Sequence, residues 1–404
     1  MRMSSLEKYR WGEIFIMAIL ILMSGSPILN IPLIFGFSGI LALVYSLRRS
    51  DYSLRGKLWK YCVFLLLIFL GQLFTLPFIS YLGSINVLAK IVFGATIMWV
   101  LKDRFREYYL NVMYFFAIVS LVLFFLGIIG ISIPDLFPST INRKSILIYN
   151  TLIISEVRNS GPFWEPGAYA CYLLLVPLLY VDNLKKFVVD NKKKVYVLFV
   201  ALITTISTTG YICLFILILY FYLKESKNKF LAYTIYLPLA IGVMYFAYNS
   251  LEFMGEKIES QQEVALDLDG EFSNSRMGSL LFDLHYIKKH PLVGNGLHEQ
   301  TRFADHPFLW GVGMGHGNAF SNYMSQMGVL AMVVYLILLY KAFNRKLIAP
   351  IIVVLLFQGE QLLNFPLFLS LPFVIMSVKN NCKTKNILYE NNETNSNNYN
   401  SIQS

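Results

Sequence analysis

The chain has 404 residues, of which 56% are hydrophobic and 14% are charged, and its formal net charge is +10. Because soluble domains carry about 25% charged residues, this composition excludes a soluble globular protein and indicates an integral membrane protein. The basic residues follow the membrane topology argued below, so the positive charge is no evidence for binding to nucleic acid.

Apolar segments recur along the chain at the length that a transmembrane helix requires, about 20 residues. They predict an all-α polytopic membrane protein with about twelve helices. Two helix pairs are separated only by short breaks, near residues 24–27 and 207–210. The predicted spans cover residues 12–25, 31–47, 58–77, 85–101, 108–130, 162–181, 194–207, 209–223, 230–248, 318–340, 347–359 and 363–378.

Basic residues predict the orientation, because short cytoplasmic loops retain Lys and Arg. With the N-terminus inside the cell, the cytoplasmic segments hold most of the Lys and Arg residues, including the clusters within 48–60 and 185–194. This alternation holds only if both short breaks are real. Both termini are then expected in the cytoplasm.

The predicted topology divides the chain into four parts. Residues 1–248 hold nine helices and an external loop, 131–161. Residues 249–317 form a large external loop between the ninth and tenth helices. Residues 318–378 hold the last three helices. The end of the chain, 379–404, is rich in Asn and Ser and is expected to be disordered.

The first external loop carries Arg143 and Arg158 and then runs into Phe163, Trp164 and Glu165 before the sixth span. Pro and an acidic residue both suit the first turn of a helix, so one interpretation is an ordinary helix start. The other is that Glu165 faces a solvated cavity, because an acid at the membrane edge is costly unless it is solvated or paired.

The second external loop ends in a segment that contains all five histidines of the chain. Its residues 276–290 have apolar side chains at helical spacing, which predicts an amphipathic helix on the membrane surface. Arg276, Ser279, Asp283 and His290 would share the opposite face. That face is either a water-facing side with an Arg276–Asp283 pair or an anion site above the membrane.

Metal binding finds little support in the sequence. Asp267 and Asp269 have the spacing of a site for a hard cation, but such pairs are common in solvated acidic loops. His298 and Glu299 begin a zinc-protease motif, yet Arg302 stands where the second histidine would have to be. We therefore expect no metal and no cofactor.

Glycines at 294, 296, 311, 313, 315 and 317 surround the last histidines and allow tight turns with backbone N–H groups near a ligand. His316 stands where this loop re-enters the membrane, two residues before Asn318. A structural role for this histidine and a catalytic one are both compatible with that position.

Arg276, the turn 289–296, the segment 316–320 and the segment 326–329 together resemble the signature of the O-antigen polymerase and ligase superfamily. Residues 158–166 also resemble an element of capsule and exopolysaccharide polymerases of this group. Two departures stand out: Gly317 separates His316 from Asn318, and an arginine expected near residues 206–210 is missing. Arg158 or Arg143 would supply that charge instead.

The resemblance implies a membrane glycosyltransferase of GT-C type in the plasma membrane of a bacterium. Its substrates would be oligosaccharide repeats linked to undecaprenyl diphosphate on the external face. A polymerase moves the growing glycan to another lipid-linked repeat, and a chain-length regulator and a flippase would be its partners. A ligase, which uses lipid A core as acceptor, and a lipid-linked oligosaccharide flippase are the alternatives.

Such a reaction needs a base for the acceptor hydroxyl and positive charge for the departing diphosphate. His316 has a suitable pKa for the base, and Glu165 is the alternative. Arg276, Arg158 and Arg143 suit the diphosphate, because guanidinium groups bind phosphate oxygens bidentately. Trp164 and Asn318 are expected to contact substrate, and packing within the protein is the alternative role for Trp164.

Overall fold

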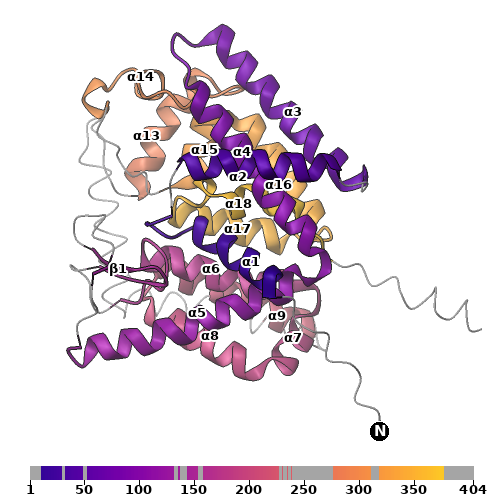
Figure 1. The fold of residues 1–404 in the computed structure, drawn as a ribbon, viewed down its shortest axis with the longest axis vertical. Helices are drawn as coiled ribbons and strands as arrows, with labels where there is room; N and C mark the ends of the chain where they lie inside the picture. Colours follow the sequence, from indigo (N-terminus) through magenta and orange to yellow (C-terminus); the bar gives the residue numbers. More distant parts are fainter. Residues whose placement is uncertain are drawn as a thin grey trace, which may run out of the picture.

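The computed structural model describes residues 11–29, 32–48, 52–131, 135–136, 143–152, 158–226, 230, 234, 238, 276–310 and 318–376. These residues are mostly helical, as predicted (Figure 1). The first half of the chain forms α1 (Trp11–Met23), α2 (Pro32–Arg48), α3 (Tyr52–Thr75), α4 (Tyr81–Leu101), η1 (Lys102–Arg104), α5 (Phe105–Ile128), α6 (Pro166–Leu179), η3 (Val181–Asn183), α7 (Leu184–Asp190), α8 (Lys192–Thr204) and α9 (Thr208–Glu225).

The remaining described helices lie within or after the predicted external loop, 249–317. They are α13 (Arg276–Lys289), α14 (Glu299–Arg302), η5 (Pro307–Leu309), α15 (Ala319–Met327), α16 (Val329–Ala342), α17 (Ile348–Gly359), η6 (Leu362–Asn364), α18 (Pro366–Ser370) and η7 (Leu371–Phe373).

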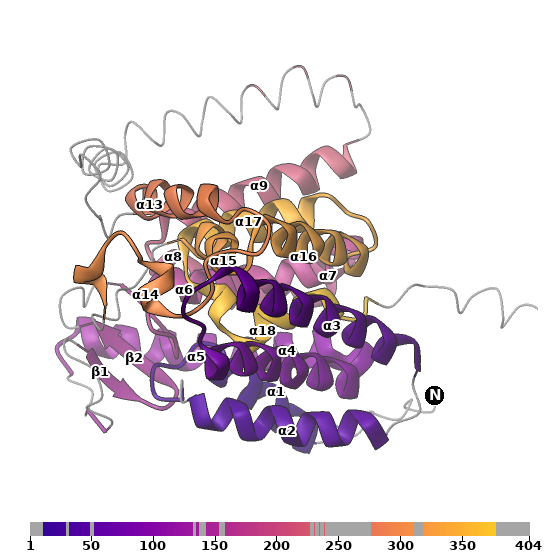
Figure 2. The ribbon, with the colours of Figure 1, turned by 90° about the horizontal axis from the view of Figure 1, so that it is seen from above.

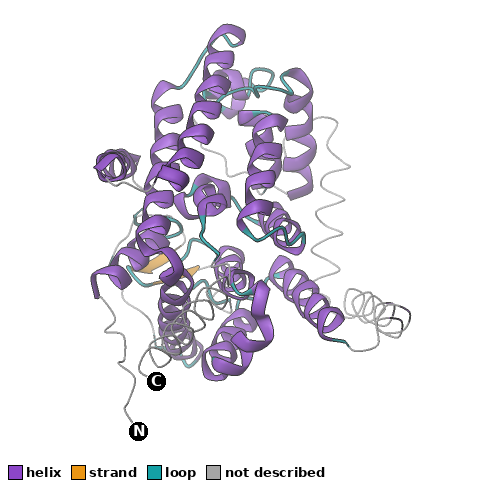
Figure 3. Cartoon of the chain, turned by 90° about the vertical axis from the view of Figure 1, so that its right-hand side faces the viewer, coloured by secondary structure: helices purple, strands orange, loops and turns teal. Residues whose placement is uncertain are grey.

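One antiparallel hairpin departs from the all-α prediction. It consists of β1 (Arg143–Ile146) and β2 (Tyr149–Leu152), with Lys144 opposite Thr151. In the described part of the chain these are the only strands (Figure 3). The hairpin lies in the first predicted external loop, where a helix is not needed to satisfy the backbone because water can do so.

Three described helical stretches are long and apolar enough to cross a membrane: Gly56–Thr75, Tyr81–Ile128 and Thr208–Glu225. The pair formed by α6 with η3 and α7 makes a fourth if the two arms, bent by 54°, count as one span. These helices support a membrane protein, whereas the number of twelve spans stays a prediction. The ninth predicted span, 230–248, lies almost entirely outside the described residues.

The twelfth predicted span, 363–378, is not one helix. Its described residues form η6, the five-residue α18 and η7, and Val374 to Met376 are not helical. Pro366 begins α18, and Pro372 lies within η7. A proline removes a backbone donor and clashes with the preceding turn, which explains why the apolar composition did not produce a continuous helix.

Helices from distant parts of the chain pack side by side. α4 lies between α2 and α3 and also contacts α18 (Figure 2). The approach to α18 is close: a Cβ added at Gly94 would lie 2.6 Å from the carbonyl oxygen of Pro366. Lipid provides no hydrophobic driving force between helices, so helices in a membrane associate through close packing, which small residues allow.

The break between α15 and α16 occurs at Gly328, within the tenth predicted span. Gly328 has φ +85° and ψ 159°, a conformation that is essentially restricted to glycine. The turn after α13 lies against this break, because Val329 N–H donates to Pro291 O at 2.8 Å. An added Cβ on Gly328 would come within 2.0 Å of Leu292 O.

Side-chain amides complete this junction. Gln72 of α3, only 1% exposed, donates through Nε2 to the carbonyl oxygens of Val293 and Gln326, at 2.6 and 2.8 Å. Asn295 Nδ2 donates to Ser325 O at 3.1 Å. A broken helix in an apolar environment must have its free backbone groups satisfied. The glycine-rich turn that resembles a family motif therefore has a structural role.

We predict that Gly328→Ala lowers the free energy of unfolding by roughly 2–5 kcal/mol, because it adds backbone strain and a clash with Leu292. The measurement is the apparent melting temperature in detergent. Gly127→Ala is the matched control, since a Cβ added at Gly127 in α5 meets nothing within 4 Å. Equal melting temperatures for the two variants would contradict the described junction.

Candidate functional site

Four charged residues from distant segments form what we term the arginine–glutamate cluster: Arg158, Glu165, Arg276 and Glu360. Burial lowers the pKa of Arg158, the charges of Glu165 and Glu360 raise it, and that of Arg276 lowers it. All four residues are therefore close enough to interact electrostatically. The predicted topology placed each of their segments at the external side of the membrane.

Arg276 begins α13 and reaches the end of α17. Its Nη2 lies 3.3 Å from Glu360 Oε1, and its Nη1 lies 3.4 Å from Thr209 Oγ1 in α9. The side chain of Glu360 is 5% exposed, whereas that of Arg276 is 24% exposed. The pair is longer than the 2.7–2.9 Å of a strong charge-assisted bond, so the guanidinium is held loosely.

The carboxylate of Glu360 lies against the first turn of α6. A Cβ added at Gly167 would lie 1.9 Å from Glu360 Oε1, so only glycine fits there. The preceding Gly359 also packs closely on Thr209, in the first turn of α9, since a Cβ added there would lie 2.8 Å from Thr209 Oγ1. The positive ends of two helix dipoles thus point at the cluster and favour negative charge.

The side chain of Arg158 binds backbone carbonyl groups in the break between α8 and α9. Its Nε donates to Thr205 O at 3.2 Å, and its Nη2 donates to Ile206 O at 3.0 Å. The break between the seventh and eighth predicted spans is thus present, and Arg158 satisfies its carbonyl groups. These bonds use two of the five N–H groups of the guanidinium, and the side chain is only partly buried.

Glu165 is exposed and immediately precedes α6, with Pro166 as the first helical residue. Its side chain makes no capping hydrogen bond. The helix-start interpretation is correct for the backbone, whereas the carboxylate acts on the charge of Arg158. The interpretation that Glu165 faces a solvated cavity stays a prediction.

Trp164 lies beside the cluster and packs within the protein. Its ring stacks on that of Phe365, with a centroid separation of 4.7 Å. The neighbouring Phe163 is fully buried and stacks on Tyr172 at 3.9 Å. These contacts favour the packing role that the sequence left open for Trp164.

The remaining predicted site residues divide into two groups. Asn318 is 3% exposed, and its Oδ1 accepts a hydrogen bond from Ser321 N–H at 3.1 Å, so it caps α15. Arg143 is the first residue of β1, and its side chain is outside the described part. His316 and the predicted Asp267–Asp269 pair also lie outside the described residues.

The expected Arg276–Asp283 pair is wrong, and so is the water-facing side proposed for this helix. Asp283 is fully buried and pairs with Arg302, while Ser321 Oγ donates to its Oδ2 at 2.6 Å. The polar side of α13 packs on α15, whereas Leu281 and Leu284 are exposed. The buried ion pair explains the inversion, because it gives the polar face partners inside the protein.

Arg302 extends this pair toward the cluster. Its Nη2 donates to Asn322 Oδ1 at 3.4 Å, and Asn322 Nδ2 donates to Gln361 Oε1 at 3.2 Å. Phe303 lies beneath the guanidinium at 4.9 Å from its ring centroid. Within the described residues, Arg302 Nε and Nη1 have no hydrogen-bond partner. These hydrogen bonds connect Arg302 with Gln361, the residue that follows Glu360.

The four described histidines do not form a metal site. His285 Nε2 lies 2.7 Å from Asp305 Oδ2, and His306 Nδ1 lies 2.7 Å from the hydroxyl of Tyr286. Hydrogen bonds from His285 and Lys289 lower the pKa of Asp305. No group of three His, Cys, Asp or Glu residues suited to a metal occurs in the described part of the chain.

The site residues predicted from the sequence did not include Glu360, Thr209 and Arg302. Glu360 could have been predicted as a site residue, because it is the only charged residue between Lys346 and Lys379 in the sequence. An acid in such an apolar stretch is costly unless it is paired. Arg302 was considered only as a residue that breaks a zinc motif, and no spacing rule connects it to Asp283.

Comparisons with protein-family models, with curated proteins and with solved structures find no match for this chain.

We predict that Asp283→Asn and Arg302→Met each lower the free energy of unfolding by about 3–5 kcal/mol, because each leaves one buried charge unpaired. The double variant should cost clearly less than the sum of the two. The measurement is a double-mutant cycle on unfolding in detergent, and strictly additive effects would show that the two side chains do not interact.

Proposed function

We propose that this chain is a membrane glycosyltransferase of GT-C type that polymerises a bacterial polysaccharide. It moves a growing glycan from undecaprenyl diphosphate to another lipid-linked repeat at the external face of the plasma membrane. The observation that carries the proposal is the arginine–glutamate cluster at the ends of α6, α9 and α17.

Two arginines close together favour an anion. Each guanidinium lowers the stability of the other's charge unless negative charge lies nearby. Glu360 supplies part of it and is itself held by Arg276. A diphosphate would supply the rest, with Arg158 and Arg276 as donors and the dipoles of α6 and α9 adding to the positive potential.

Glu360 suits a positioning role better than that of a base. Its carboxylate is buried, paired with Arg276 and packed against Gly167. A salt-bridged carboxylate is a weak base, because the adjacent positive charge favours its ionised form. We assign to Glu360 the task of holding the Arg276 guanidinium toward the diphosphate.

The proposed reaction is a single displacement. The acceptor hydroxyl oxygen attacks the anomeric carbon, and its proton passes to a base on the protein. The bond between this carbon and the diphosphate oxygen breaks, and the diphosphate leaves with the electron pair. Direct displacement inverts the anomeric centre. His316 is the first candidate for the base, and Glu165 is the second because it is exposed beside Arg158.

We predict that Arg158→Lys and Arg276→Lys each lower kcat/KM for elongation by about 10²–10³, because Lys cannot bind phosphate bidentately. The assay uses the purified protein with lipid-linked repeats. Arg104→Lys is the control, since Arg104 forms an ion pair with Glu13 at the predicted cytoplasmic side. Unchanged elongation by both cluster variants would refute the diphosphate role.

Replacing each candidate base separately identifies which one acts. His316→Ala should abolish elongation, while Glu165→Gln should leave most of it if His316 is the base. The reverse result would assign the proton to Glu165. If both single variants elongate normally, neither residue is the base.

The polymerase, ligase and flippase alternatives predict different glycans in cells that lack this protein. Loss of a polymerase leaves single repeat units in place of a ladder on an electrophoretic gel. Loss of a ligase leaves a polymer that is not attached to lipid A core. Loss of a flippase traps repeats inside the cell, and that result would contradict the proposal.

A further inference from the structure

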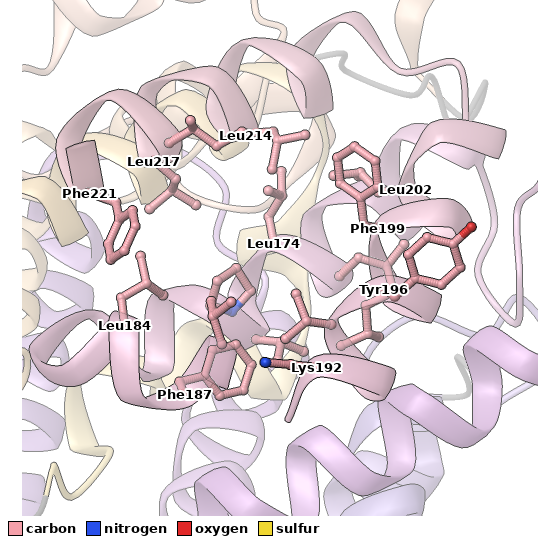
Figure 4. Close-up of a pocket in the computed structure, with 17 residues that line it drawn as sticks. Leu174, Leu184, Phe187, Lys192, Tyr196, Phe199, Leu202, Leu214, Leu217 and Phe221 are labelled. Atoms are coloured by element: carbon pink, nitrogen blue, oxygen red, sulfur yellow. The ribbon is translucent and has the colours of Figure 1, made fainter. Parts of the chain in front are cut away.

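A groove of about 420 Å³ lies among α6, α7, α8 and α9, away from the arginine–glutamate cluster along these helices. Its lining is almost entirely aliphatic and aromatic, and Lys192 is the only charged lining residue. Figure 4 shows the Lys192 ammonium group close to the ring of Phe187, with Leu174, Leu214 and Leu217 on the other side of the groove.

The groove arises because the chain bends sharply between α6 and α7, which form two walls of the groove. The axes of α6 and of the η3–α7 segment differ by 54°. α7 thus runs away from α6, and its buried residues Leu184 and Phe187 face the gap. The outer side of α7 carries exposed residues, among them Lys185 and Lys186. This short helix has the amphipathic character of a segment that lies at a membrane surface.

The dimensions of the groove match one leaflet of a bilayer. Lys192 lines one end, and Leu202 lines the groove further along the same helix. At about 1.5 Å per residue, α8 rises about 15 Å between them. The hydrocarbon core of a bilayer is about 30 Å thick, so an acyl chain in the groove would extend through about half of it.

The positive charge of the lysines at the mouth of the groove is unusual for the start of a helix. Lys192, Lys193 and Lys194 form the first turn of α8, where the helix dipole disfavours cations. Asn191 at the N-cap makes no side-chain hydrogen bond to this turn. Lys194 donates to Asn111 Oδ1 at 2.6 Å, whereas Lys192 and Lys193 are exposed. An anionic group at this position would satisfy both the ammonium groups and the helix dipole.

We propose that this groove binds one anionic phospholipid, with an acyl chain between α7 and α9 and its phosphate at Lys192 and Lys193. The positive segment 185–194, with five lysines and one aspartate, complements such a headgroup. The cytoplasmic leaflet, which this segment is predicted to face, is the leaflet that attracts polybasic segments. The bound lipid completes the packing between the bent α6–α7 arm and α9.

The test is retention of lipid by the purified protein. The protein is reconstituted in bilayers of equal parts phosphatidylglycerol and phosphatidylcholine, extracted into neutral detergent and weighed intact by native mass spectrometry. We expect one retained phosphatidylglycerol. Because each lysine near an anionic headgroup contributes about fivefold in affinity, Lys192→Ala/Lys193→Ala should lose most of it. Lys57→Ala/Lys60→Ala, which removes two exposed lysines of α3, is the charge-matched control.

A second variant tests the apolar part of the groove. Leu217→Trp fills the space beside Phe221 and should prevent retention although every lysine is kept. A photoreactive benzophenone side chain at Leu217 should attach to phospholipid. Equal retention of phosphatidylcholine, equal loss in the α3 control, or covalent capture of a peptide from residues 227–275 would overturn the proposal. Preferential retention of undecaprenyl phosphate, when this lipid is added to the same bilayers, would do the same.

Discussion

The buried carboxylate of Glu360 connects four elements that are far apart in the chain. Glu360 is the residue at the end of α17. Its carboxylate lies against the first turn of α6 at Gly167 and pairs with Arg276 at the start of α13. Arg276 also reaches Thr209 in α9. A carboxylate inside an apolar protein is stable only with such partners. The Arg276–Glu360 pair therefore holds the start of α13 against the end of α17 and the first turn of α9.

Polar side chains at helix breaks support this arrangement. Arg158 satisfies the carbonyl groups between α8 and α9, and Gln72 satisfies those around the Gly328 break. The Asp283–Arg302 pair then ties α13 and α14 to α15. The end of the helices that is predicted to be external thus contains broken helices, buried charges and partly exposed arginines. Unwound or interrupted backbone at membrane depth is tolerated where it is buried or lines a solvated site.

The sequence predicted features that follow from local composition. The breaks near residues 24–27 and 207–210, the helix beginning at Arg276 and the helix start after Glu165 are all present. The twelfth predicted span is not continuous because prolines interrupt it. The polar face of α13 is buried because Asp283 pairs with Arg302 inside the protein. Glu360 was overlooked although it stands alone in an apolar stretch. Long-range pairs of this kind depend on tertiary packing, which a single sequence does not encode in any fixed spacing.

We propose above all that Arg158 and Arg276 together bind the lipid diphosphate. The most direct test is equilibrium binding of an undecaprenyl-diphosphate-linked repeat to the purified protein and to Arg158→Gln/Arg276→Gln, at increasing salt concentration. We expect tight binding that weakens with salt for the unmodified protein, and an affinity at least about tenfold lower for the variant. Equal affinity and equal salt dependence of the two proteins would contradict this proposal.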